Sequence, residues 1–552
     1  MTPTLTLSLG LRYEYYGVAH EADNRTTVFD LNQFHGVCLG SGSSNGPILI
    51  PINTAPCPKN PSLYNPDYTN FDPRVGLAWS PSSWQGKGVI RAGWGIYTGA
   101  AQNDDLNAGL ESDRFTAFVN LDPGGPGTPL LPAYQQEIPD LSPLGTNVAT
   151  LQQPRALQRH GRRNLYAESW GLTIEHELAW NTIVSLQYVG TRGVHLFSRG
   201  GVNFCISKPD PVTGVCTRAL DPYYPDPTGQ RPTLDPYGSV DYKADIGAST
   251  YNAFLVGLER HLKNGLAFQF HYIWSHSIND GSVGGGESNG PENVNCLACD
   301  KGPSVFDVRH NIAVNADYQL PFGQGKSYLN GGGTLDKIVG GWSVSGIGLW
   351  HTGHPLTITM NISPTQLPDG NDQTTQRPDL VPGVPVLLPG GVQNYTLPIN
   401  PAAFAPPPLD PAGAEFNPAT GMCTSTCGLL SRFGNAPNGL IRAPNYWQID
   451  LSLVKETKIT ERVALQFGVQ FFNVFNHIQL GDPSTGNLAF NYVQATDANG
   501  NLIPNKWILQ PAGTLGLITT TVNFNNNNDN KASPNTGTGL PRQIQFMVRV
   551  RF

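Results

Sequence analysis

Apolar and polar residues alternate with a period of two over many stretches of this chain. In residues 3–16, every second side chain from Leu5 to Tyr15 is apolar or aromatic, and those between them are small or polar. This period is typical of a β-strand with one apolar and one polar face. Including the first stretch, the pattern predicts about twelve strands, at 3–16, 71–80, 88–99, 164–178, 182–198, 247–262, 266–278, 307–320, 340–352, 445–457, 461–476 and 541–552.

The predicted strands are long. Many reach the roughly 9–11 residues that a tilted strand needs to cross a bilayer, whereas strands of soluble domains average about five or six. Aromatic residues fall mostly toward their ends, as in the interfacial girdles of membrane barrels. The pattern therefore predicts an all-β, antiparallel transmembrane β-barrel.

The connections between these strands alternate between short and long. Lys263-Asn264-Gly265 carries the Asn-Gly signal of a tight type I′ hairpin. Further short connections are residues 178–181, 321–339 and 458–460. Such alternation predicts short periplasmic turns and long extracellular loops. The long connections are rich in Pro, Gly and Asn and span 17–70, 100–163, 201–246, 279–306, 362–444 and 477–540.

The amino-acid composition further narrows the class of protein. Only 14% of the 552 residues are charged and 39% are hydrophobic, while 62 are Gly and 47 are Pro. This balance disfavours a helical bundle, and a net charge of -7 gives no general attraction to nucleic acid. The uncharged stretch 338–368 is interrupted by Gly, Ser, Thr, His and Pro, and its residues 342–350 alternate with a period of two, so it predicts a strand and no membrane helix.

Eight cysteines form four local pairs, each within one predicted loop. An oxidising compartment would join them as disulfides. Free thiols are one alternative interpretation, and half of a zinc site is another for the Cys-x-x-Cys pair. The pairs are Cys38 with Cys57, Cys205 with Cys216, Cys296 with Cys299, and Cys423 with Cys427.

Several strand motifs resemble TonB-dependent outer-membrane receptors of the Oar-like type. The resemblance covers most of the predicted strands, and the combination is more specific than any single motif. Its motifs lie at 188–196 (YVGTRGVHL), 249–253 (STYNA), 264–266 (NGL), 272–277 (YIWSHS), 306–311 (FDVRHN), 320–323 (LPFG), 340–346, 450–477 and 542–552.

The resemblance implies an uptake function for a scarce or bulky nutrient at the cell outer membrane. In that family a 22-stranded barrel surrounds an N-terminal plug that contacts the inner-membrane TonB complex. No plug or signal peptide is recognised in residues 1–552, so we expect them to form the C-terminal portion of such a barrel. The implied partners are outer-membrane lipid, lipopolysaccharide and the barrel-assembly machinery, with TonB reached only through the plug. The ligand stays unidentified, and no cofactor is expected.

Two sets of residues are predicted to act in the barrel. The C-terminal strand resembles the family's assembly signal, which implies this role for Ile544, Phe546, Val548, Val550 and Phe552. Inward-facing polar residues are expected to line the lumen: Arg12, Glu14, Arg91, Glu175, Gln269, Asp450 and Gln466.

The sequence gives only weak signals for an enzyme, for metal binding and for contact with lipopolysaccharide. Gly323-Gln324-Gly325-Lys326-Ser327 is similar to the end of a phosphate-binding loop, but Leu320 occupies a required Gly position, so no enzyme is predicted. Glu287, Glu292 and Asp300 are weak calcium candidates in an acidic loop. A basic cluster at 155–163 is a candidate contact for lipopolysaccharide, with an ordinary solvated loop as the favoured alternative. A surface-exposed all-β adhesion or glycan-binding protein remains the alternative function.

Overall fold

The computed structural model describes most of the predicted strands and parts of the connections between them. The described residues are 4–18, 27–29, 37–39, 64–100, 155–158, 161–202, 240–281, 291–293, 296–323, 325–331, 333–363, 366–368, 376–410, 428–460, 462–522 and 541–552.

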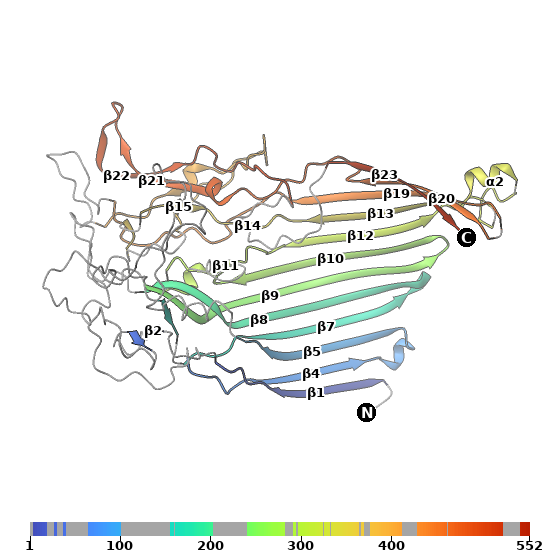
Figure 1. The fold of residues 1–552 in the computed structure, drawn as a ribbon, viewed down its shortest axis with the longest axis horizontal. Helices are drawn as coiled ribbons and strands as arrows, with labels where there is room; N and C mark the ends of the chain where they lie inside the picture. Colours follow the sequence, from blue (N-terminus) through green and yellow to red (C-terminus); the bar gives the residue numbers. More distant parts are fainter. Residues whose placement is uncertain are drawn as a thin grey trace, which may run out of the picture.

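One antiparallel sheet dominates the molecule, and twelve strands follow one another across it in chain order (Figure 1). Each of the twelve overlaps one predicted stretch, so the predicted all-β antiparallel fold is confirmed. We call these strands the wall. They are β1 (Leu5–Tyr13), β4 (Phe71–Trp79), β5 (Gly88–Thr98), β7 (Tyr166–Leu178), β8 (Thr182–Val202), β9 (Val240–Lys263), β10 (Leu266–Asn279), β12 (His310–Gln319), β13 (Trp342–His351), β19 (Tyr446–Lys458), β20 (Ala464–Phe472) and β23 (Gln543–Arg551).

The pairing register keeps one apolar face and one mainly polar face across the wall. Residues directly opposite each other in neighbouring strands point to the same side. On the polar side, Gln466 of β20 lies opposite Glu456 of β19 and Arg549 of β23. On the apolar side, Phe467 lies opposite Val548. A one-residue slip of any strand would move its apolar side chains to the polar face, so the alternation fixes the register.

Short connections gather at one end of the wall and long ones at the other, as predicted (Figure 1). Strands β9 and β10 are joined by Asn264 and Gly265, whose φ angles of 55° and 81° are those of a type I′ turn. Other short connections contain η1 (Ser82–Trp84), η5 (Ala179–Asn181) and α2 (Thr334–Val339). Among the described residues, no helix combines the length and apolar composition that a membrane span requires.

The wall is an open sheet. Strand β1 pairs with β4, and β23 pairs with β20; the described strands include no pairing between β1 and β23. Short strands join the same sheet near the long connections: β2 (Thr27–Phe29), β3 (Val37–Leu39), β6 (Arg155–Leu157) and β11 (Gly302–Pro303). The last is followed by the segment that leads into β12, and it is preceded by η8 (Leu297–Asp300).

A second folded region lies beyond the long-connection end of the wall, and we call it the loop module. It comprises residues 353–363, 366–368, 376–410, 428–445 and 477–522. The alternation predicted connections for most of these residues, whereas the structure forms three small sheets. These contain β14 (Pro355–Leu356), β15 (Thr359–Asn361), β16 (Asp379–Leu380), β17 (Phe404–Ala405), β18 (Ile441–Arg442), β21 (Ala489–Thr496) and β22 (Leu502–Pro511), beside η10 (Pro401–Ala403) and η11 (Thr485–Leu488).

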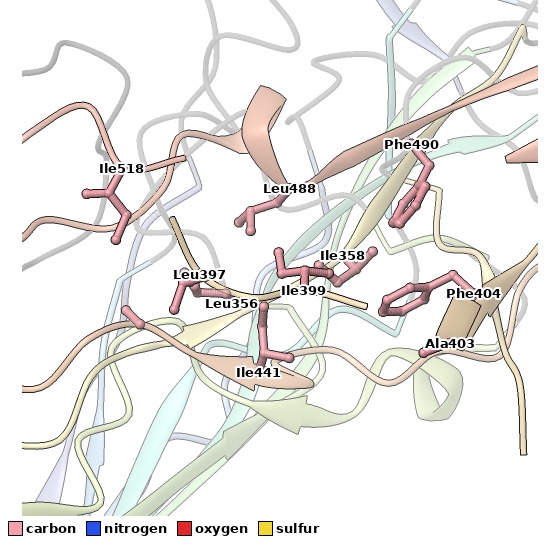
Figure 2. Packing of buried hydrophobic residues seen from close by; sticks show 11 residues of the cluster. Leu356, Ile358, Leu397, Ile399, Ala403, Phe404, Ile441, Leu488, Phe490 and Ile518 are labelled. Carbon is pink, nitrogen blue, oxygen red and sulfur yellow. The ribbon is translucent and has the colours of Figure 1, made fainter. Parts of the chain in front are cut away.

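The loop module has its own hydrophobic core (Figure 2). Phe490 of β21 is fully buried, and its ring centroid lies 5.2 Å from that of Phe404. Leu356, Ile399 and Ile441 come from three further segments of the module and are buried in the same cluster. Segments far apart in the sequence thus bury apolar surface against one another, which holds the module together.

Candidate functional site

The polar face of the wall carries side chains that pair across neighbouring strands. Nη1 of Arg91 lies 2.5 Å from Oε2 of Glu175, which connects β5 to β7. Gln269 on β10 accepts a hydrogen bond of 2.9 Å from Asn315 and lies 3.3 Å from Glu259, to which it donates. These contacts form between partly exposed groups, so they organise the face more than they stabilise the fold.

The same face continues to the C-terminal strand. Gln466 donates a 2.6 Å hydrogen bond to Glu456, and Nη1 of Arg551 lies 3.5 Å from the same carboxylate oxygen. Asp450 accepts hydrogen bonds from the Gln448 side chain and, at 2.7 Å, from the backbone N–H of Asn473. Acids, amides and an arginine therefore bond to one another on this part of the polar face.

At the opposite edge, Arg12 of β1 is ion-paired with Glu14, which directly follows the strand. The hydroxyl of Tyr16 also donates to Glu14, at 2.9 Å. The register places six of the seven residues expected to line the lumen on this one face, and Glu14 is joined to it by its ion pair. Their role in a lumen stays a prediction.

Glycines create a hollow of about 680 Å³ near β1 to β8. Gly76 on β4, Gly93 on β5 and Gly171 on β7 lie in register, so this row of the polar face has no side chains. Arg74 and Arg91 border the hollow. The guanidinium carbon of Arg74 lies 4.4 Å from the centroid of the Tyr97 ring, which supports it by a cation–π contact. This hollow can accept a segment of protein or a ligand against the wall.

A buried ion cluster joins two long connections at the end of the wall. Arg377 lies 2.5 Å from Glu292 and 2.6 Å from Asp300, and all three side chains are almost fully buried. Its backbone N–H also donates to Glu292 at 2.7 Å, and its guanidinium donates to the carbonyl of Cys299. Burial raises the pKa of Glu292 to about 7 and also raises the pKa of Asp300, while Arg377 opposes both shifts.

The ion cluster involves two of the three residues that were candidates for binding calcium. Glu292 and Asp300 already have a guanidinium partner, so the cation that they hold in this structure is that of Arg377. Glu287 lies outside the described residues. No group of three or more potential metal ligands occurs among the residues that the structure describes.

A disulfide joins Cys296 and Cys299 beside the ion cluster. Cys38 belongs to the short strand β3, although the chain pattern suggested no cysteine in a strand; the structure describes only its backbone. The other five predicted disulfide cysteines lie outside the described residues: Cys57, Cys205, Cys216, Cys423 and Cys427.

Asp307 forms a second polar node, where β10, the segment before β12 and β18 meet. Its fully buried carboxylate accepts hydrogen bonds from the Ser277 N–H at 2.7 Å and from Arg442 at 2.5 Å. Burial alone would raise the pKa of Asp307, but these hydrogen bonds hold the pKa below its usual value. The alternation pattern missed Arg377 and Arg442, because their partners lie in distant connections.

The structure corrects the candidate lipopolysaccharide contact in part. Arg162 is buried, with its Nε 2.7 Å from Asp245 and its guanidinium 4.1 Å from the Tyr64 ring centroid. A buried, paired arginine is unavailable to an anionic lipid. Arg163 is exposed, and Arg159 and His160 lie outside the described residues.

Comparison with known families settles the class of protein. A family model described as outer membrane beta barrel domain matches residues 1–545. The chain belongs to this family. As an outer membrane β-barrel protein, it is located in the outer membrane of the Gram-negative type, as predicted, and the apolar face of its wall is the one that suits lipid.

Solved structures show distant likenesses. The outer membrane transporter YddB from Escherichia coli is 10% identical over 81% of this chain and 40% of that chain, with a TM-score of 0.36. The ferripyoverdine receptor of Pseudomonas aeruginosa is 10% identical over 75% of this chain and 30% of that chain, with a TM-score of 0.30. The FrpB iron transporter from Neisseria meningitidis is 8% identical over 82% and 38%, with a TM-score of 0.31.

The outer membrane β-barrel chain thus spans 30% to 40% of the length of these three structures. No curated protein matches it.

Proposed function

We propose that this chain forms part of the barrel of an Oar-like, TonB-dependent transporter that takes up a scarce or bulky nutrient. The observation that carries the proposal is the continuous polar face across twelve strands, with the opposite face apolar along its whole width. Such a sheet suits a wall between lipid and a water-filled or plugged lumen. The strand motifs add the resemblance to Oar-like receptors.

The proposed barrel is larger than this sheet. Both edge strands, β1 and β23, have a side without a strand partner among the described residues. Unpaired strand edges are costly in a membrane, so further strands are expected to complete the barrel, up to about 22 in such transporters. In this proposal residues 1–552 are the C-terminal barrel portion, and a plug belonging to the same receptor connects it to TonB.

The hollow beside Gly76, Gly93 and Gly171 is the proposed contact for that plug. A glycine row lets a neighbouring backbone approach the wall closely, and Arg74 and Arg91 at its border offer charged hydrogen-bond donors. The long connections would face outward and take part in ligand capture. No enzymatic role is proposed.

The aromatic end of β23 is the proposed contact for the barrel-assembly machinery. Phe546 and Val548 are more than two-thirds exposed on the apolar face, at 68% and 67%, and Phe552 is 97% exposed. Deleting Phe552 should lower the amount of chain assembled in the outer membrane. Normal levels after this deletion would contradict the assembly role.

Heat-modifiable migration in gels tests the barrel itself. A closed barrel keeps its fold in detergent without boiling and migrates differently after boiling, whereas a soluble surface adhesin needs no detergent. Transport is tested separately, by ligand uptake in cells that carry the gene with its genomic upstream region. An in-frame plug and signal peptide in that region would support the proposal, and a stop codon with a promoter directly upstream of Met1 would contradict it.

A further inference from the structure

The loop module, together with the residues that lead into it from β20, exposes apolar side chains next to the apolar face of the wall. Leu388 and Tyr395 are 48% and 53% exposed, and Phe475 and Ile478 are 63% and 51% exposed. The inner side of the same segment is anchored, because Leu397 is buried in the module core. The exposed side chains therefore belong to a fixed surface, which we call the apron: residues 387–396 and 475–480.

The apron carries no ionic side chain. Residues 381–409 contain no Asp, Glu, Lys or Arg, and neither do residues 463–481. A loop surface that meets only water usually carries charged residues, and an exposed apolar patch marks a contact with another phase or partner. Lack of charge is what burial in hydrocarbon requires.

A strained turn presents Tyr395 at the tip of the apron. Gln393 and Thr396 exchange two backbone hydrogen bonds, of 3.1 and 2.9 Å, around Asn394 and Tyr395. Both central residues have positive φ, 47° and 60°, which is common for Asn but costly for an aromatic residue. Gly would fit this second position more easily. Since backbone strain is often retained for function, the tyrosine ring is the feature to explain.

The ring lines a hollow of about 660 Å³ together with Trp350 and Trp447. These tryptophans lie directly opposite each other on β13 and β19, on the apolar face. Trp447 also donates a 3.1 Å hydrogen bond to His477, which lines the hollow as well. Tryptophan and tyrosine favour the boundary between hydrocarbon and lipid headgroups, and the volume lies within the usual range for ligand pockets.

We propose that the apron dips into the lipid leaflet at the long-connection end of the wall, and that the hollow accepts an acyl chain of a membrane lipid. Continuity with the apolar face of a wall that resides in the outer membrane favours lipid over a soluble protein or a free sugar. The proposal rests on membrane insertion of the wall and needs no transport activity.

A tryptophan reporter tests the depth of the apron. The complete receptor, expressed from the gene with its genomic upstream region, is inserted into dioleoylphosphatidylcholine vesicles with or without bromine on the acyl chains. The fluorescence that Tyr395→Trp adds to the parent should be quenched by bromine at least about twofold more than that added by Leu502→Trp. Leu502 is a matched control, because it is 45% exposed on β22, away from the hollow. Equal quenching of the two additions would overturn the proposal.

The parent chain separates this proposal from the barrel assignment. Trp94, Trp170 and Trp274 lie on the apolar face of the wall and should be quenched in every variant. Quenching of these residues without extra quenching at position 395 would contradict the apron alone. No quenching of the parent would contradict membrane insertion of the wall, and with it the apron.

Lipid retention tests the hollow. Native mass spectrometry of the chain extracted from the bromine-free vesicles should show a retained lipid for the parent and for Leu502→Ser. Tyr395→Gly should lose most of it while the module keeps its stability, because glycine relieves the positive φ. Equal retention by Tyr395→Gly and the parent would overturn the proposed hollow. Tyr395→Phe keeps the ring and should retain the lipid, so loss of the lipid from a folded Tyr395→Phe variant would also overturn it.

Discussion

The wall and the loop module are stabilised in different ways. Among the described residues, every buried member of the hydrophobic clusters lies in the module, where short segments from distant parts of the chain pack together. Strands of the wall instead leave large apolar side chains such as Leu9 and Phe546 exposed, at 78% and 68%. The wall therefore depends on lipid to cover its apolar face, whereas the module provides its own apolar interior.

This contrast has a consequence for substitutions. A change inside the module should act on its folding in water, and an equivalent change on the apolar face of the wall should act through membrane insertion. Hydrogen exchange measured on peptides of the folded chain can follow each region separately, because local opening reports local stability.

The largest expected effect is Phe490→Ala. Phe490 is fully buried in the module core, and removing its ring should destabilise the module by about 4 kcal/mol through lost burial and a cavity. Exchange of module amides should accelerate strongly, while amides of β7 and β8 stay protected. Phe546→Ala is the control on the wall. If Phe546→Ala accelerated hydrogen exchange of the module amides as much as Phe490→Ala does, the two regions would not be stabilised independently.

The next effect concerns the buried ion cluster. Arg377→Met leaves Glu292 and Asp300 buried without their cation, and we expect a loss of about 3 kcal/mol in module stability. Arg432→Met is the matched control. It removes an ion pair with Asp379 in which the arginine side chain is 46% exposed, so it should cost less than about 1 kcal/mol. Similar losses in both variants, measured by exchange, would show that burial does not decide the effect.

Much of the wall was predictable from sequence and little of the module was. Each wall strand repeats a period of two over roughly ten residues, and Asn264-Gly265 identifies its own turn. Some strands of the module, such as β14 and β16, have two residues each, which is too short to show any period, and the longer strands β21 and β22 were not predicted either. Their formation depends on tertiary contacts that only the folded chain brings together.

The candidate site likewise contains contacts that the sequence pattern predicts and contacts that it does not. Arg91 and Glu175 could be placed on one face because strand alternation determines facing. By contrast, Arg377 and Glu292 are separated by 85 positions and lie in two connections without alternation. No local pattern indicates that they meet, and the acidic loop suggested calcium because its arginine partner is remote.

The stability of the buried ion cluster should depend on pH. Burial raises the pKa of Glu292 to about 7, above its ordinary value of 4.5. The ion cluster of the folded chain then binds more protons than the unfolded chain does between these values, so the stability of this cluster, which joins Arg377 of the module to Glu292, should fall as pH rises from about 4.5 to 7. Hydrogen exchange, corrected for the pH dependence of the intrinsic exchange rate, should show this fall in stability with pH in the parent. The fall should be smaller in Glu292→Gln. An unchanged fall in the variant would contradict the assignment to Glu292.

The smallest effect on stability is expected at the polar face. Arg91→Ala removes a pair whose side chains are 53% and 34% exposed, which should cost less than about 1 kcal/mol. If the face lines a lumen, the same variant should still alter permeation or plug contact, measured as ligand uptake by cells carrying the complete receptor. Arg91→Lys is the control, and an assembly defect in Arg91→Ala without any change in uptake per assembled receptor would contradict a lumen role.

Hydroxyl-radical footprinting in lipid vesicles shows whether lipid covers the apolar face of the wall. Trp274 on β10 and Trp180 in the turn after β7 are both largely exposed on the isolated chain, at 54% and 74%. We expect Trp274 to be protected from oxidation in vesicles and Trp180 to be oxidised, because lipid covers the wall and leaves the turn in water. Comparable oxidation of both tryptophans would contradict lipid coverage of the wall.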